Sequence, residues 1–277
     1  MARSAASARV GTRACRFALR SVNMQTPPPV RQPRNPGTSI IRLSIIVYAS
    51  VLAFTALAVA AWYWYKPPDE IPGMIYIPAG TFLAGAGKHA VKLKAFYIDA
   101  TEVTNADYSD FCATHGCPVP LGARNLPAVN VSITLARTYA NWKRKRLPSA
   151  LEWERAARGV NGAPYPWGDT PDPSLANVFN HPSLAQHQLM PVRSFAPHPA
   201  FQMAGNAWEM VEGEARPSPQ DIADFRSRLT PPLSEDEPWI SIRGGSYMKP
   251  LIPMYESQAI PARYTAADIG FRCVKDP

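Results

Sequence analysis

The longest apolar run of the chain lies near its N-terminus. Residues 43–65 read LSIIVYASVLAFTALAVAAWYWY and include no charged side chain. Because an α-helix rises about 1.5 Å per residue, this run would extend about 34 Å, against a bilayer hydrocarbon core of about 30 Å. Four aromatic residues, 62–65, end the run, as is typical of a membrane–water interface. The pattern predicts a transmembrane helix over residues 43–65.

Charge is distributed unevenly around this run. Residues 1–66 hold eight arginines and Lys66 but no acid, a charge of +9, so residues 67–277 carry −1 of the net +8. Because an arginine costs about 2.5–3.5 kcal/mol at mid-bilayer, we expect the basic tail, residues 1–42, to stay on the cytoplasmic side. A linker at residues 66–72 would lead to a periplasmic or other extracytoplasmic domain. The nearly neutral charge of that domain excludes a basic nucleic-acid-binding surface.

Other interpretations of the N-terminal region stay open. Ala58-Val59-Ala60 resembles a signal-peptidase site, although the long leader and the trailing aromatic cluster favour an uncleaved signal anchor. Residues 1–23 are rich in Arg, Ser and Ala and lack acids, as in a mitochondrial presequence, which would place the chain in the mitochondrial inner membrane. Met24 is an alternative start, and the Pro-rich run 27–36 predicts a disordered spacer.

Periodic patterns predict strands and helices beyond residue 73. Residues 74–82 (MIYIPAGTF) predict a strand that ends in a turn, and residues 91–98 predict a second strand. Helices are expected over residues 104–114, 132–143 and 149–159. The third helix has the strongest signals, because Ser149 and Glu152 fit a capping box and Gly159 fits a helix end.

After Gly159 the chain changes character. Pro, Gly, Asn and aromatic residues dominate, and short apolar runs occur at residues 190–195, 239–243 and 270–274. The segment 211–237 is acidic and Pro-rich, and no internal repeat is found. These features predict an α+β domain over residues 73–277, with much irregular loop.

The chain has four cysteines, and only two of them lie close together in the sequence. Cys15 lies in the tail and Cys273 near the C-terminus, whereas Cys112 and Cys117 lie on either side of an expected helix end. A disulfide between Cys112 and Cys117 would form in an oxidising compartment, and two buried thiols are the alternative. Because the histidines lack zinc-ligand spacing and no Cys-x-x-Cys pair occurs, no structural zinc site is expected.

Eight short motifs occur in a fixed order along this domain. They are Met74-Ile-Tyr-Ile-Pro-Ala-Gly-Thr-Phe, Asp99-Ala-Thr-Glu-Val-Thr-Asn, Val129-Asn-Val-Ser, Lys145-Arg-Leu-Pro-Ser-Ala-Leu-Glu-Trp-Glu-Arg-Ala-Ala-Arg-Gly, Tyr165-Pro-Trp-Gly-Asp, Met203-Ala-Gly-Asn-Ala-Trp-Glu, Arg243-Gly-Gly-Ser-Tyr and Gly270-Phe-Arg-Cys. The series resembles the formylglycine-generating enzyme (sulfatase-modifying factor) family. This resemblance implies the family's C-type-lectin-like fold for residues 73–277.

The resemblance also implies where copper would bind. In the family's enzymes, two cysteines that follow the Arg-Gly-Gly-Ser-aromatic motif hold the metal, and their positions correspond here to Lys249 and Met254. Soft Cu(I) requires thiolates or thioethers. Met203, Met248 and Met254 could imitate such a site, but methionines near an apolar run more often serve packing. Cys273 corresponds to a structural position. Formylglycine-generating activity is therefore not expected of this chain.

Sulfoxide synthesis and hydrolysis by a catalytic triad are also not expected. The sulfoxide synthases of the family bind iron through histidines of an additional helical domain, which has no counterpart here. A hydrolytic triad cannot be assembled, because Ser246 has no histidine near it in the sequence. The sequence thus indicates a pseudoenzyme.

Calcium ligands of the family are better matched. The resemblance implies a site formed by Gln202, by the carbonyls of Gly205 and Ala207, and by the carboxylate of Glu209, which are the oxygen donors that Ca²⁺ prefers. The alternative is that Glu209 accepts backbone N–H bonds. A second site would begin at Asn177, but its downstream Asp is not found.

Several charged residues in the motifs are expected to hold the fold together. Irregular loops leave backbone groups without partners, which charged side chains can satisfy through strong hydrogen bonds. We therefore expect internal charge-assisted hydrogen bonds from Glu102, Glu152, Arg146, Arg243 and Arg272.

Three functions are compatible with these features. The first is a non-catalytic binding or scaffold protein, an accessory subunit of a membrane protein complex, with segment 211–237 as a docking insertion and the small residues between 49 and 60 allowing close helix packing. The second is a divergent oxidase or a maturation factor for an envelope enzyme. The third is a carbohydrate-binding lectin-like module, which rests on fold analogy alone.

Overall fold

A computed structural model describes residues 36–64, 69–184, 186–196 and 200–277. The chain divides into two compact units, residues 1–66 and residues 67–277. Residues 1–35 of the tail predicted at residues 1–42, Tyr65 at the end of the predicted transmembrane segment, and residues 66–68 of the predicted linker lie outside the described residues.

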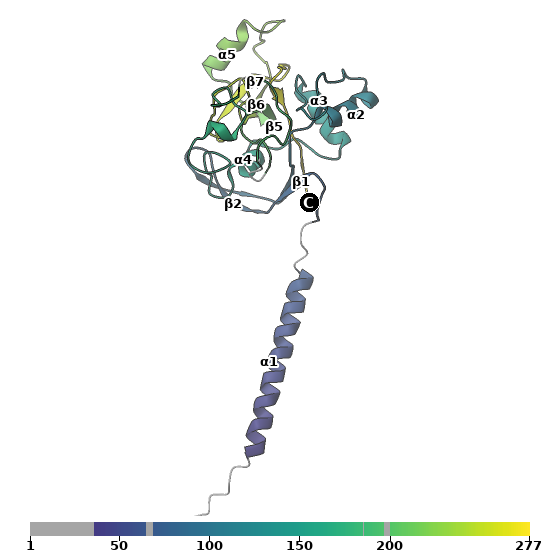
Figure 1. Cartoon of the computed structure of the whole chain (residues 1–277), viewed down its shortest axis with the longest axis vertical. Helices are drawn as coiled ribbons and strands as arrows, with labels where there is room; N and C mark the ends of the chain where they lie inside the picture. The colour runs from purple at the N-terminus through teal and green to yellow at the C-terminus, as the bar shows by residue number, and fades with distance from the viewer. Residues whose placement is uncertain (1–35, 65–68, 185, 197–199) are drawn as a thin grey trace, which may run out of the picture. The chain divides into compact units, whose positions relative to one another are not determined.

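The first unit contains one continuous helix, α1, from Pro36 to Trp64 (Figure 1). It begins within the segment that the sequence analysis assigned to the tail. Where its side chains are described, from residue 44 to residue 60, they are exposed, including the large apolar residues Ile45, Leu52 and Phe54. Over the described residues, no helix has both the length and the apolar character of a membrane-crossing candidate.

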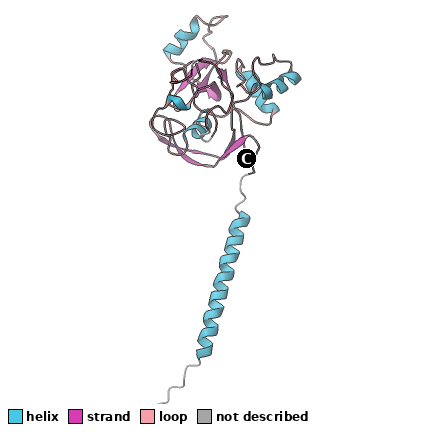
Figure 2. Cartoon of the chain, viewed as in Figure 1, coloured by secondary structure: helices cyan, strands magenta, loops and turns pink. Residues whose placement is uncertain are grey.

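Short strands of the second unit form separate sheets (Figure 2). A three-stranded antiparallel sheet has the order β1 (Met74–Ile77), β4 (Phe96–Asp99) and β9 (Val274–Lys275). A hairpin pairs β2 (Gly80–Ala84) with β3 (His89–Leu93). A four-stranded sheet has the order β7 (Ser257–Pro261), β6 (Trp239–Arg243), β5 (Trp208–Glu214) and β8 (Ile269–Gly270), with β8 parallel to β5.

The helices of the second unit begin at hydrogen-bonded caps. They are α2 (Asn105–His115), α3 (Ile133–Trp142), α4 (Ala150–Arg158), α5 (Pro219–Arg226) and one 3₁₀ turn (Pro173–Leu175). The Ser149–Glu152 capping box of α4 is present, and Gly159 ends the helix at a φ of 67°. The predicted helices at residues 104–114, 132–143 and 149–159 are therefore confirmed. They could be predicted because helix caps are local sequence signals.

The strand predictions are only partly right. The segment 74–82 contributes to two strands, since the chain turns after Ile77 and enters β2 at Gly80. The predicted strand 91–98 is likewise two strands, β3 and β4, because its first half pairs with β2 and its second half with β1 and β9. Residues 190–195 form no strand, and Val192 donates its N–H to the carbonyl of Asn125 instead.

The acidic segment 211–237 is more ordered than a loop. Its first residues complete β5, and α5 follows, with Ser218 and Asp221 in a second capping box. Phe225 of α5 is buried, and its ring lies 4.8 Å from that of Tyr264 and 5.8 Å from that of Trp239. These ring contacts pack α5 against the four-stranded sheet.

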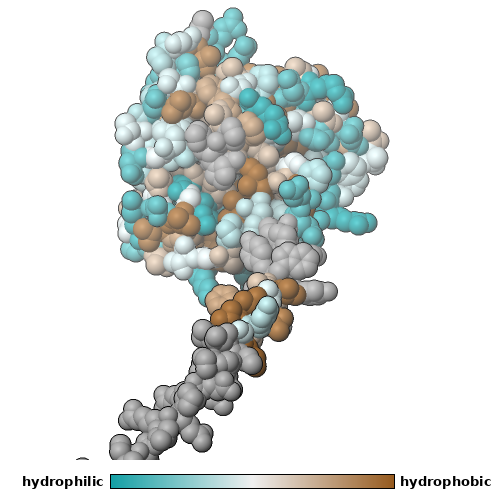
Figure 3. Space-filling model, turned by 60° about the horizontal axis from the view of Figure 1, so that its bottom comes forward, coloured by the Kyte–Doolittle hydropathy of each residue, from teal (hydrophilic) through white to brown (hydrophobic). Residues whose placement is uncertain are grey.

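Two apolar clusters form the core, and β5 contributes to both. Trp208 and Met210 belong to the cluster that α2 and α3 cover, whereas Val211 belongs to the cluster that α4 shares with β1 and β4. Because side chains of a strand alternate between its two faces, Trp208 and Met210 point into one cluster and Val211 points into the other. The face of the domain seen in Figure 3 mixes hydrophilic and hydrophobic residues.

A disulfide joins Cys112 and Cys117 at the end of α2, which settles the choice between a disulfide and two thiols. Cys112 is buried in the core, and Gly116 caps the helix in the left-handed conformation at a φ of 69°. The bridge therefore fixes the turn that follows α2.

We expect Cys117→Ala to lower the stability of the full chain. Loss of a bridge across so short a loop costs about 2 kcal/mol in the chain-entropy model, or a fall in Tm of roughly 4–8 °C for a domain of this size. Thermal melts followed by circular dichroism test this, with Cys15→Ala as the control that should leave the Tm unchanged. Labelling of all four cysteines in the denatured, unreduced chain would contradict the bridge.

Candidate functional site

The two positions that the family resemblance assigns to copper ligands, Lys249 and Met254, differ in environment. Lys249 is exposed, and its backbone bonds to the carbonyl of Ser246 and the N–H of Phe179. Met254 is fully buried in the cluster around α4, and its N–H donates to the carbonyl of Pro164 at 2.7 Å. An ammonium group cannot bind Cu(I), and the thioether of Met254 packs among apolar side chains.

The other sulfur atoms do not replace these ligands. Met203 is buried in the same apolar cluster as Met254, whereas Met248 is 47% exposed. Two of the three methionines therefore serve as packing residues, and the third lies at the surface. Cys273 is fully buried, and burial, followed by the nearby Asp99 carboxylate, raises the pKa of its thiol well above the usual range. A neutral thiol is a poor nucleophile and a poor metal ligand.

A cavity of about 420 Å³ lies beside Met248 and Lys249. Its walls come from all four strands of the large sheet or their ends, and from Phe225 and Arg228 of the α5 region. Asp268, which lines the cavity, accepts a hydrogen bond from the buried Ser246 at 2.7 Å. Among the described residues that line this cavity there is no Cys or His. The arrangement can bind a ligand, but it offers no activated nucleophile.

Glu209, the predicted calcium ligand, is bonded to other side chains. Arg272 donates from Nε to Oε2 and from Nη2 to Oε1, both at 2.6 Å, and the indole N–H of Trp153 donates to Oε2 at 2.6 Å. Glu209 and Arg272 are 1% and 0% exposed. Burial lowers the pKa of Arg272, but Glu209, together with Glu102 and Asp99, more than offsets this, so the pKa lies above its usual value. The donors are thus side chains rather than the expected backbone N–H groups.

This donor set does not fit calcium at Glu209. Its carboxylate faces a guanidinium, which would repel a cation, and both of its oxygens already accept strong hydrogen bonds. Gln202 and Ala207 are buried, and the amide of Gln202 has no partner among the described residues. No group of three or more His, Cys, Asp or Glu within the described part of the chain could hold a metal.

Gly205, another predicted ligand, lies where no side chain would fit. Its φ is 74°, and an added Cβ would lie 2.3 Å from the carbonyl oxygen of Asn177. Its N–H donates to the carbonyl of Gly244 at 2.8 Å. The glycine therefore allows two loops to approach closely, which is an architectural role.

Asn206 is the hub of a buried amide network that the sequence analysis did not identify. Its Oδ1 accepts from Asn177 Nδ2 and from the N–H of Met190, both at 2.9 Å. Its Nδ2 donates to Glu102 Oε1 at 2.8 Å and to the carbonyl of Met190 at 3.2 Å. Asn177, where a second calcium site was expected to begin, therefore donates to a neighbouring side chain. The only sequence signal was the Gly-Asn dipeptide of the motif.

The expected internal bonds of the remaining charged residues are present. Arg146 donates to Glu152 at 2.7 and 2.8 Å, and Arg243 donates to Glu154 at 3.3 Å. Arg158, which was not predicted, also pairs with Glu154, and all three residues of this second cluster are buried. These motif residues act as structural partners.

Glu102 differs from them because one carboxylate oxygen, Oε2, has no partner among the described residues. Burial raises the pKa of Glu102 to about 7, against the opposing effect of Arg272 and with a contribution from Glu209. The cavity beside Glu102 has a volume of about 330 Å³. The protonation of this carboxyl group should therefore change near neutral pH.

We expect Glu209→Gln to destabilise the domain strongly. It leaves the charge of Arg272 buried without its partner, which costs about 3–5 kcal/mol, or roughly 6–20 °C in Tm. The control is Glu212→Gln on the same strand, which removes an exposed pair with Arg137 and should cost at most about 1 kcal/mol. If EGTA lowers the Tm of the unaltered chain and calcium restores it, the calcium prediction holds and this assignment of Glu209 fails.

We expect Glu102→Gln to change how stability depends on pH. Because the folded pKa lies above the unfolded one, Glu102 contributes most below about pH 4.5, and this contribution is lost as pH rises through about 7. The free energy of unfolding of the variant relative to that of the unaltered chain should therefore rise between pH 5 and pH 8, by an amount on the order of 1 kcal/mol or more, and its relative Tm should rise with it. Glu152→Gln, whose carboxyl has a lowered pKa, should show no such rise, and equal slopes would contradict the prediction.

Named relatives match this chain over most of its length. The inactive C-alpha-formylglycine-generating enzyme 2 of Mus musculus is 29% identical over 225 residues, covering 56% of this chain and 73% of the relative. The formylglycine-generating enzyme of Streptomyces coelicolor is 28% identical over 297 residues, covering 76% and 91%.

Solved structures show the same fold. PvdO from Pseudomonas aeruginosa matches with a TM-score of 0.59 and 22% identity, over 77% of this chain and 97% of that one. CarF matches with a TM-score of 0.58 and 21% identity, over 76% and 99%. The mixed α+β architecture is thus that of formylglycine-generating-enzyme-type structures.

The family model described as "Sulfatase-modifying factor enzyme 1-like domain" matches residues 64–277. This match includes all eight motifs and the whole of the domain predicted at residues 73–277. The chain therefore belongs to the FGE-sulfatase family of sulfatase-modifying factor enzyme 1-like proteins.

Proposed function

We propose that this chain is a membrane-anchored, non-catalytic member of its family, which binds or scaffolds partners as an accessory subunit of a membrane protein complex. The observation that carries the proposal is the chemistry at Lys249 and Met254. One position presents an exposed ammonium group and the other a packed thioether, where the family's enzymes hold copper with two thiolates. A relative from Mus musculus with the printed name "inactive" is consistent with this reading.

Membrane attachment is proposed from the sequence of residues 43–65. This segment has no charged residue, ends in four aromatic residues and follows a basic tail, which together favour a cytoplasmic N-terminus and an extracytoplasmic domain. The Cys112–Cys117 disulfide supports an oxidising compartment for the domain. The partner would be an integral membrane complex or a protein on the extracytoplasmic side.

The alternative is a divergent oxidase or a maturation factor for an envelope enzyme. It is favoured by relatives that carry the name formylglycine-generating enzyme, including the one from Streptomyces coelicolor. In this chain the alternative lacks a set of sulfur ligands for copper. The thiol of Cys273 is buried with a raised pKa, and Met248 is exposed whereas Met203 and Met254 are buried. The first proposal needs no such ligands.

One purification tests both parts of the proposal. We expect the full chain to stay in the membrane pellet after an alkaline carbonate wash, because an integral helix resists such extraction. After release in mild detergent, the chain should contain less than about 0.1 copper per chain and consume no oxygen with a cysteine-containing peptide, since it lacks two thiolate ligands. Metal analysis and an oxygen electrode provide the readouts.

The Streptomyces coelicolor relative, loaded with copper and assayed in the same detergent, is the positive control. Stoichiometric copper with oxygen uptake in this chain would overturn the non-catalytic proposal. Complete release by carbonate would overturn the anchor. A detergent-extracted chain that migrates as a free monomer would remove the support for a subunit role.

A further inference from the structure

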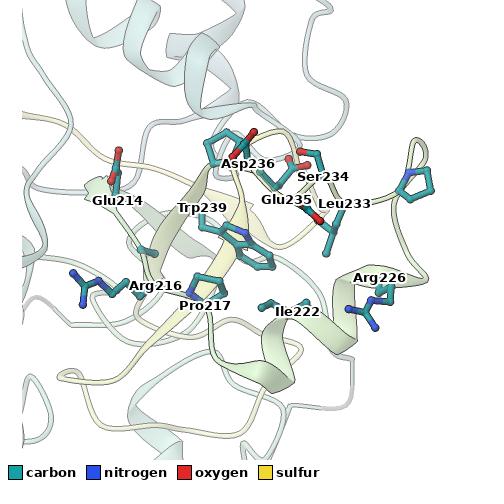
Figure 4. Close-up of a pocket in the computed structure, with 14 residues that line it drawn as sticks. Glu214, Arg216, Pro217, Ile222, Arg226, Leu233, Ser234, Glu235, Asp236 and Trp239 are labelled. Atoms are coloured by element: carbon teal, nitrogen blue, oxygen red, sulfur yellow. The ribbon is translucent and has the colours of Figure 1, made fainter.

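A groove of about 700 Å³ lies between the end of β5, helix α5 and the loop 232–238 (Figure 4). It is lined by residues of the acidic segment 211–237 together with Pro238 and Trp239, and it shares no lining residue with the cavity beside Lys249. Figure 4 shows the indole of Trp239 in the middle of the groove, with Pro217 and Ile222 below it and Leu233 to one side. The floor is therefore aromatic and the neighbouring wall apolar.

Contacts behind the groove hold its shape. Trp239 begins β6, and its ring packs at 5.8 Å against Phe225, which fixes the indole on its inner side. On the outer loop, Glu237 accepts from Nε of Arg263 at 3.0 Å, and Arg263 also donates to the carbonyl of Pro231 at 2.7 Å. Both walls are thus anchored to the large sheet or to residues that follow it.

Three carboxylates at the groove are free of such contacts. Glu214, Glu235 and Asp236 are exposed, and among the described residues none of their carboxylates has a hydrogen bond or an ion pair. In Figure 4, Glu235 and Asp236 lie above the indole, on the side opposite Pro217. Two arginines, Arg216 and Arg226, also line the groove, at its two lower corners in this view. The negative groups therefore gather along one edge.

We propose that this groove binds an arginine side chain carried by an extended segment of a partner protein. The guanidinium would lie over the indole of Trp239 and bond to Glu235 and Asp236, because arginine both stacks on aromatic rings and pairs with carboxylates. Apolar residues of the partner would contact Ile222 and Leu233. The inference rests on the proposed binding role and assigns to it a site and a ligand chemistry.

The charges favour this occupant over an acidic one. An anionic side chain at the indole would meet the unpaired carboxylates of Glu235 and Asp236, which would repel it. Glu237 adds no further charge of its own, because Arg263 neutralises it. Arg216 and Arg226 line the groove at its lower corners in Figure 4, on the side away from that edge, where they would face other parts of an extended partner segment.

Peptide binding to the full chain in detergent tests the proposal. The probes are a fluorescein-labelled, C-terminally amidated Gly-Leu-Arg-Pro-Gly peptide and the same peptide with neutral citrulline or with glutamate in place of arginine. We expect the arginine peptide to bind about tenfold more tightly than the citrulline peptide and the glutamate peptide to bind least. Fluorescence anisotropy gives the Kd, which should increase with salt.

Variants then locate the site. Glu235→Gln and Asp236→Asn should each weaken the arginine peptide at least about threefold, and Trp239→Phe should also weaken it, since phenylalanine is a poorer partner for a cation. Asp224→Asn is the matched control, because it removes the same charge from α5, where Asp224 bonds to Gln220 and does not line the groove. It should change the Kd less than twofold.

Several outcomes would overturn the proposal. These are no binding of the arginine peptide, equal binding of the citrulline peptide, stronger binding of the glutamate peptide, or an equal effect of Asp224→Asn and Asp236→Asn. Self-association of the chain that Asp236→Asn abolishes would show that a second copy occupies the groove instead. Because these measurements read neither copper content nor resistance to a carbonate wash, their failure leaves the proposed function to its own test.

Discussion

The buried pair of Glu209 and Arg272 is the contact on which the domain depends most. It joins a strand of the large sheet to the C-terminal segment, and Arg272 also donates to the carbonyls of Asp99 and Phe201. Trp153 of α4 donates to the same carboxylate. Because both charges lie out of water, either one left alone would be costly, so the sheet, α4 and the end of β4 must come together as a unit.

This constraint determines what the family motifs do in this chain. The carboxylate that the family resemblance assigned to calcium holds an arginine, and Asn206 in the same motif connects Glu102, Asn177 and Met190 rather than a ligand. A carboxylate with both oxygens bonded to a guanidinium has little left to offer a cation. The motifs preserve a scaffold, and the features that could recognise a partner lie on the insertion around α5.

Much of the fold could be predicted because its signals are local. Ser149 and Glu152 are three residues apart, so their capping box could be recognised without knowing the rest of the structure. The position that the family resemblance assigns to a copper ligand, Met254, could likewise be found by counting along the chain. The division of residues 91–98 into β3 and β4 could not be predicted, because it depends on which distant strand each half pairs with.

The sequence by itself determined the family, the order of the motifs, the helix caps and the residue types at positions 249 and 254, since each is a property of residue identity or short spacing. Only the tertiary structure decided that Glu209 pairs with Arg272, that Cys112 bonds to Cys117, and that segment 211–237 folds back to form a groove over Trp239. Glu209 and Arg272 are 63 positions apart, and no local pattern specifies which buried charge meets which. That choice is made by the packing of the whole domain, where an unpaired charge is the most expensive error.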